Sequence, residues 1–190
     1  MAVDTVQVVA PPKEAVPLPE SGAPLRLGGW DHVAFSVPDL VEAERWYVDV
    51  LGAEPVGRYN WGGDTAHEGA PPHVDVRIGT SVLSLFLGDA MTGATGVPRH
   101  YHYAINCPSL AELEQWQTYL RSKGVKLRND GAVHGHPGFG AVSLYFEDPW
   151  GAKLEIVTWL PDYATAEAEV KKRGGIIMGA PSAGGHRPAR

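Results

Sequence analysis

The sequence contains little cysteine, no cluster of basic residues and no long apolar run. Its 190 residues include one cysteine, Cys107, so no disulfide bond can form within the chain, and we expect a reducing, cytoplasmic location. The net charge is −6 without a run of Lys or Arg, which argues against nucleic acid or an anionic membrane as a partner. The absence of a membrane-length apolar stretch and of signal-peptide features fits the same expectation.

Two segments of the chain are copies of each other. Residues 32–46 align without a gap to residues 102–116, with seven identities in fifteen positions. Each copy predicts a strand followed by a helix that starts at a capping residue and ends at Gly52 or Gly124. Strand candidates then follow at 53–60, 72–78, 80–87, 125–130, 140–147 and 152–159, with Gly-, Pro- and His-rich loops at 61–71 and 131–139. The order β-α-β-β-β, present twice, indicates a duplicated unit.

The duplication predicts one α+β domain with an open, cup-shaped sheet of eight strands. We expect this domain over residues 28–172, with modules at about 28–88 and 99–159 and a last helix at 160–172. The Pro- and Ala-rich segment 1–27 is predicted to be an extended arm, and 173–190 an irregular tail. Half-open cups leave sheet edges and apolar rims exposed, so we also expect a homo-oligomer.

His32, His102 and Glu155 form the most informative pattern in the sequence. The two histidines occupy equivalent positions in the two copies, 70 residues apart, and Glu155 follows His102 by 53 residues. Side chains alternate along a strand, which places all three on faces without the aliphatic residues that would pack under a helix. Two imidazoles and one carboxylate can hold a divalent metal and leave positions open for substrate and oxygen. We predict a metal site; the alternative is two satisfied core histidines and a solvated glutamate.

This pattern resembles the vicinal oxygen chelate superfamily: glyoxalases, thiol-transferring fosfomycin resistance proteins and type I extradiol ring-cleaving dioxygenases. The resemblance covers about residues 28–159 and implies that the metal ligands are His32, His102 and Glu155. Glyoxalase-like members usually add a fourth ligand from the last strand of the first module, where this sequence has Ser84, a poor ligand. The implied metal is Fe(II), with Mn(II) as the other candidate.

The stretch from His136 to Glu155 is similar to the signature of the extradiol dioxygenases. His136 lies nine residues before Tyr145, and Tyr145 lies ten before Glu155, as in that family. The resemblance implies that Tyr145 hydrogen-bonds a substrate oxygen and that His136 donates to another oxygen. We therefore predict a dioxygenase that cleaves a small aromatic diol of the catechol type with O2. The plainer alternatives are a tyrosine in the strand wall and an exposed loop histidine.

One histidine of the extradiol enzymes has no counterpart here. It lies about fifteen residues before the second-module ligand, where this chain has Phe86–Asp89. His67, His73 or His134 would then have to take its place from a loop. Two alternatives stay open: a metal-dependent lyase, isomerase or thiol transferase of the same fold, and a metal-free protein that sequesters a drug.

Overall fold

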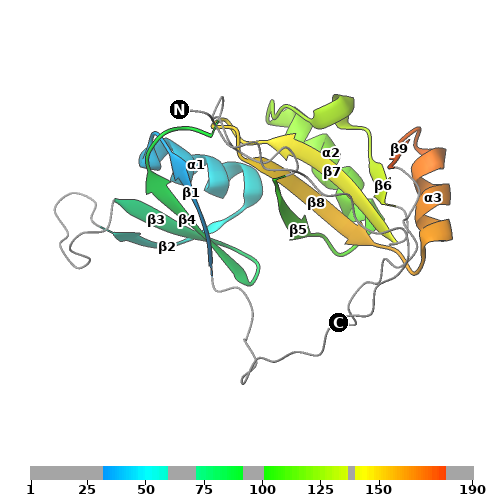
Figure 1. Ribbon diagram of the computed structural model, residues 1–190, viewed down its shortest axis with the longest axis horizontal. Coiled ribbons are helices and arrows are strands. Elements are labelled where there is room, and N and C mark those ends of the chain that lie inside the picture. The colour runs from blue at the N-terminus through cyan, green and yellow to red at the C-terminus, as the bar shows by residue number, and fades with distance from the viewer. Residues whose placement is uncertain (1–31, 60–71, 92–100, 137–139, 179–190) are drawn as a thin grey trace, which may run out of the picture.

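The computed structural model describes residues 32–59, 72–91, 101–136 and 140–178, except the side chain of His136 (Figure 1). The predicted arm at 1–27 lies outside them. The first module consists of β1 (His32–Val37), α1 (Leu40–Leu51), β2 (Glu54–Tyr59), β3 (His73–Ile78) and β4 (Ser81–Leu87). Its strands form one sheet in the order β1-β4-β3-β2, with β1 parallel to β4 and the other neighbours antiparallel.

The second module repeats the arrangement and adds a strand. It consists of β5 (Tyr103–Asn106), α2 (Leu110–Ser122), the 3-10 helix η1 (Arg128–Gly131), β6 (His134–His136), β7 (Ala141–Glu147) and β8 (Lys153–Trp159). The predicted last helix is α3 (Tyr163–Lys172), and it leads to β9 (Ile176–Ile177) within the segment predicted to be irregular. The sheet order is β5-β8-β7-β6-β9, with β9 parallel to β6.

The prediction of a strand at 125–130 is wrong. In this stretch only Leu127 forms a bridge, to Phe146, before the chain turns into η1. Asn129 and Asp130 have left-handed backbones with φ of 50° and 52°, a conformation that these two residue types tolerate better than most. The sheet takes its strand β6 from the stretch 131–139, which was predicted to be a loop.

The helix termini follow from local sequence as predicted. The Asp39 carboxylate accepts a hydrogen bond from the Glu42 amide at the start of α1, and the Ser109 hydroxyl accepts one from Glu112 at the start of α2. Gly52 ends α1 in the left-handed conformation, which glycine adopts without steric cost because it has no Cβ atom. Within the described residues, no helix is both long and apolar enough to span a membrane.

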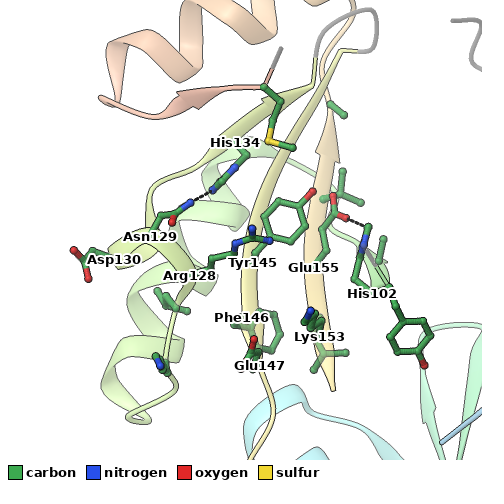
Figure 2. A pocket seen from close by; sticks show the side chains of 18 of the residues that line it. His102, Arg128, Asn129, Asp130, His134, Tyr145, Phe146, Glu147, Lys153 and Glu155 are labelled. Carbon is green, nitrogen blue, oxygen red and sulfur yellow. Dashed lines mark hydrogen bonds and ion pairs between the residues drawn. The ribbon is translucent and has the colours of Figure 1, made fainter. Parts of the chain in front are cut away.

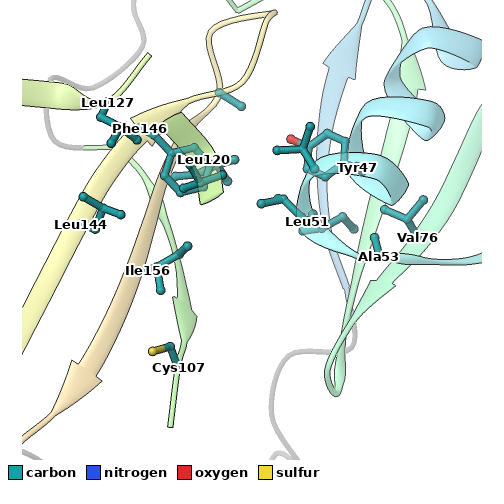
Figure 3. Close-up of a cluster of buried hydrophobic side chains, with 14 of the residues drawn as sticks. Tyr47, Leu51, Ala53, Val76, Cys107, Leu120, Leu127, Leu144, Phe146 and Ile156 are labelled. Atoms are coloured by element: carbon teal, nitrogen blue, oxygen red, sulfur yellow. The ribbon is translucent and has the colours of Figure 1, made fainter. Parts of the chain in front are cut away.

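The two modules pack together through their helix-covered sides. α1 lies on β3 and β4, and α2 lies on β7 and β8. Figure 3 shows Tyr47 and Leu51 of α1 directed toward Leu120 of α2 and Phe146 of β7. These residues belong to a single apolar core that includes both modules. Among the described elements, α1 and α2 cover only these sides, and the opposite faces of the two sheets are the places where a site can form.

The α+β architecture with two βαβββ modules is confirmed, and its strands form two sheets of four and five strands. No ladder joins β1 to β5 among the strands that the structure describes. Side chains connect the modules instead: the Tyr47 hydroxyl donates to Asp148 Oδ2 at 2.8 Å, and the Phe35 and Tyr103 rings stack with centroids 5.4 Å apart.

Candidate active site

A cavity of about 1020 Å³ lies on the open face of the second sheet (Figure 2). Strands β6, β7 and β8, the start of β5 and the η1 segment supply its walls. Side chains of alternating strand positions point into it, which is why polar residues occur between the aliphatic residues that pack under α2. Its polar lining includes His102, Arg128, Asn129, His134, Tyr145 and Glu155.

His102 and Glu155 meet in this cavity. Their Nε2 and Oε2 atoms are 2.8 Å apart, and the Glu155 side chain is buried while His102 stays partly exposed. The Ser143 hydroxyl donates a hydrogen bond to Glu155 Oε1, which fixes the orientation of the carboxylate. Ligands that share one ion at about 2.0–2.2 Å each also lie close to one another. The pair is therefore arranged as two ligands of a divalent metal would be.

His32 lies in the other module. It begins β1, is exposed, and does not line the cavity. In the part of the chain that the structure describes, no three His, Cys, Asp or Glu side chains of one copy come together as a metal site. The metal site of His32, His102 and Glu155 therefore stays a prediction. Within one chain, only His102 and Glu155 lie together.

Tyr145 stands beside Glu155 as its direct partner in the β7–β8 ladder. Its ring lies between those of His102 and His134, both edge-on, with centroid distances of 5.7 and 5.1 Å. Burial raises the pKa of the Tyr145 phenol well above its usual range, and the negative charge of Glu155 raises it further. A phenol is protonated near neutral pH even at its ordinary pKa, and the Tyr145 hydroxyl, which hydrogen-bonds Glu155, can turn to donate to a bound oxygen.

His134 was considered only as a substitute from a loop, and the structure places it on β6 in the wall of the cavity. It is 4% exposed, and its Nε2 lies 3.1 Å from Asn129 Nδ2. A short hairpin between His134 and Tyr145 would have predicted that both side chains lie on neighbouring strands. The sequence favours a loop instead, because the Gly- and Pro-rich composition of 131–139 is typical of one.

The remaining candidates lie elsewhere. His73 stacks between Tyr59 and Phe86 on the first sheet, with centroids 4.7 and 4.4 Å away. Ser84 is buried in β4. His67 and the side chain of His136 lie outside the described residues, so the catalytic role predicted for His136 stays a prediction.

The Asp-Pro-x-Gly segment that precedes Glu155 builds the turn between β7 and β8. Asp148 Oδ1 accepts hydrogen bonds from the amides of Trp150 and Ala152 at 2.9 and 2.7 Å, and Gly151 has φ of 91°. The other carboxylate oxygen accepts from Tyr47. This turn sets the register of Tyr145 and Glu155 and ties the cavity to the first module.

Comparisons with known proteins agree with this architecture. The profile of the Glyoxalase/Bleomycin resistance protein/Dioxygenase superfamily matches residues 29–156. A 2-epi-5-epi-valiolone epimerase from an Actinomyces species is 30% identical over 161 residues, which cover 75% of this chain and 85% of the relative.

Solved structures give the same fold. A lactoylglutathione lyase from Agrobacterium tumefaciens is 24% identical with a TM-score of 0.50, covering 70% of this chain and 94% of the other. The fosfomycin resistance protein FosX from Listeria monocytogenes, solved with Mn(II) and sulfate, is 16% identical with a TM-score of 0.54, covering 74% and 99%.

The 30% identical relative is named an epimerase, so it favours the predicted alternative over ring cleavage. Closeness to the extradiol dioxygenases is not shown. A divalent metal occurs in a protein of this fold, in FosX as Mn(II). The profile match over 29–156 and the paired βαβββ modules establish that the chain belongs to the Glyoxalase/Bleomycin resistance protein/Dioxygenase superfamily.

Proposed function

We propose that this protein is a metal-dependent isomerase that inverts the configuration of a carbon next to a ketone. The observation that carries the proposal is the His102–Glu155 pair at one end of a cavity that also holds the proton-bearing groups Tyr145 and His134. The similarity to a 2-epi-5-epi-valiolone epimerase supports this reaction class, since its name denotes inversion of one centre in a ketone.

The metal ligands in this proposal are His102 and Glu155 of one copy and the histidine at position 32 of a second copy. His32 is exposed on the open face of the first sheet, together with Ala34. The modules of one chain pack through their helix-covered sides, so the open face of β1 is directed away from that contact, where the cavity of another molecule can approach it. A symmetric pair of chains would form two identical sites.

The donor set suits Mn(II) or Fe(II), because two imidazoles and a carboxylate leave positions open for two substrate oxygens. When bound, the metal would polarise the substrate carbonyl and stabilise the negative charge that develops on its oxygen. The protein's own contribution is to orient the carboxylate through the hydrogen bond from Ser143.

Proton transfer falls to the groups beyond the metal pair. The Tyr145 phenol is protonated and donates a hydrogen bond to a substrate oxygen. His134 accepts the proton as the C–H bond next to the carbonyl breaks, and the electron pair moves onto the carbonyl oxygen. The epimer forms when the opposite face of this carbon takes up a proton from water and His134 releases its proton to water, so that the proton count is unchanged. An imidazole suits this role because its ordinary pKa lies close to neutral pH.

The test is exchange of the substrate proton with solvent. Protein loaded with Mn(II) or Fe(II) is incubated in D2O with a panel of hydroxyketones that includes 2-epi-5-epi-valiolone, and 1H NMR follows loss of the proton next to the carbonyl. We expect exchange that depends on the metal and is lost in Glu155→Ala. Metal-loaded protein that exchanges no ketone of the panel would contradict the proposal.

Extradiol cleavage of a catechol is the second candidate. One observation favours it: Tyr145, ten residues before Glu155 in the sequence, does line the cavity beside Glu155. Fe(II)-loaded protein with oxygen and a catechol would then give a yellow ring-opened product. Colour formation without proton exchange on ketones would favour this candidate over the isomerase.

A further inference from the structure

The η1 segment carries the positively charged side chain of Arg128 beside the cavity, and its backbone has an unusual left-handed conformation. Asn129, Asp130 and Gly131 have φ of 50°, 52° and 80°, so three successive residues are left-handed. Two side chains of α2 hold this shape: Arg121 donates to the Asp130 carbonyl, and Gln117 donates to the Gly131 carbonyl at 2.6 Å. A left-handed run that includes two non-glycine residues is maintained only where the surroundings enforce it.

This backbone directs Arg128 and Asn129 toward the same part of the cavity. The Arg128 guanidinium carbon lies 5.9 Å from the centroid of the Tyr145 ring, and Asn129 Nδ2 lies 3.1 Å from His134 Nε2. Figure 2 shows the Arg128 side chain directed toward Tyr145, while the Asp130 carboxylate points away from it. Arg128, Asn129 and His134 thus surround one end of the cavity, and His102 with Glu155 marks the other.

The positive charge of Arg128 has no carboxylate partner in the part of the chain that the structure describes. No ion pair involves this guanidinium among the residues that the structure describes, and Lys126 in the same wall has none either. Lys153, in contrast, lies directly opposite Glu147 in the β7–β8 ladder. A forked guanidinium beside a side-chain amide is suited to the oxygens of a phosphate or carboxylate.

We propose that Arg128 and Asn129 form an anion subsite that binds a phosphate or carboxylate group of the substrate. The inference rests on the proposed function, because it assigns the end of the substrate that lies away from the metal pair. It implies that the ketone acted on carries a negatively charged substituent, and that Arg128 determines this preference.

The test is calorimetric titration of the full-length protein with inorganic phosphate and, separately, with acetate, each with and without Mn(II). The variants are Arg128→Gln and, as the matched control, Arg45→Gln, which removes an exposed arginine of α1 outside the cavity. We expect Arg128→Gln to weaken binding of the preferred anion by about tenfold or more, the scale of a charge-assisted hydrogen bond, with and without Mn(II). Arg45→Gln should bind like the wild type. Tighter phosphate binding identifies a phosphorylated substrate, and tighter acetate binding a carboxylate.

Three results would overturn the subsite. They are wild-type affinity in Arg128→Gln, an equal loss in Arg45→Gln, and anion binding that disappears without Mn(II), which would place the anion on the metal. Proton exchange on ketones is measured in parallel on the same samples. Exchange without an effect of Arg128 rejects the subsite alone, whereas Arg128-dependent anion binding without exchange rejects the isomerase alone.

Discussion

Glu155 and His102 are the two residues on which the proposed metal site depends most directly. Their 2.8 Å approach and the hydrogen bond from Ser143 fix two donor atoms at one point of the cavity. We predict that Glu155→Ala and His102→Ala each lower the Mn(II) bound after dialysis at least tenfold, because the remaining ligands are too few. Metal analysis by mass spectrometry checks this, with Glu167→Ala on the surface of α3 as the control. Full occupancy in Glu155→Ala would show that the pair is not a ligand pair.

Tyr145 offers a test that separates chemistry from metal binding. Its phenol is protonated near neutral pH, as an ordinary tyrosine is, burial raises its pKa further, and Tyr145→Phe removes only the hydroxyl. We predict unchanged metal content and a loss of turnover of about 10- to 100-fold, since one hydrogen bond to a substrate oxygen disappears. Metal analysis and steady-state rates on the same preparation provide the measurement. Turnover at the wild-type rate would show that Tyr145 only lines the cavity and does not hydrogen-bond the substrate.

At the scale of elements, the turn between β7 and β8 should make stability depend on pH. Burial raises the pKa of the Asp148 carboxyl, although hydrogen bonds from the Tyr47 hydroxyl and from the amides of Ala152 and Trp150 oppose the rise. A folded-state pKa above the unfolded value of about 3.9 gives a stabilising contribution that is complete below that pH. This contribution is lost as the pH rises through the raised folded-state pKa.

Asp148→Asn lacks this titration and keeps an oxygen that can accept from the turn amides. We therefore predict that the free energy of unfolding of the wild type falls relative to Asp148→Asn as the pH rises through this range, and that the difference is constant above it. Urea unfolding of both proteins between pH 4 and 8 measures the difference. A difference that stays constant, or that shifts in favour of the wild type with rising pH, would contradict the account.

The left-handed backbone of η1 makes a second prediction for an element. Asp130 has φ of 52° and is exposed, so Asp130→Gly removes the cost of a side chain in this conformation. We expect stability to be unchanged or raised by up to about 1 kcal/mol, and Asp130→Val to lower it by about 1–2 kcal/mol. Thermal unfolding of the two variants checks the sign. Equal stability of the glycine and valine variants would show that this backbone is not held as described.

These elements also show how far local sequence determines the structure. The helices were predictable because Asp39, Ser109 and Gly52 provide capping signals within one turn of each end. The strand β6 and η1 were not, because the left-handed run that starts at Asn129 depends on hydrogen bonds from Gln117 and Arg121 of α2, and the sequence of the loop itself carries no sign of them. His134 was missed as a cavity residue because the composition of 131–139 is typical of a loop.

At the scale of the whole molecule, the duplication predicted the two modules but not how they face each other. The equivalence of His32 and His102 places each on the open face of its own sheet, and this part of the prediction follows from strand alternation. The relative placement of the sheets depends on side-chain contacts such as Tyr47 with Asp148, which join residues 101 positions apart. Such a contact has no signature in either repeat alone.

The central claim is that His32 of one copy completes the metal site of another, and a mixing experiment tests it most directly. His32→Ala and Glu155→Ala chains, each unable to hold Mn(II), are unfolded together in equal amounts and refolded, and bound Mn(II) is measured. Random pairing gives hybrid dimers with one intact site each, so we predict that about a quarter of the wild-type sites return. Sedimentation confirms that dimers have formed. If dimers form and no Mn(II) is recovered, the site is not shared between chains and the account is wrong.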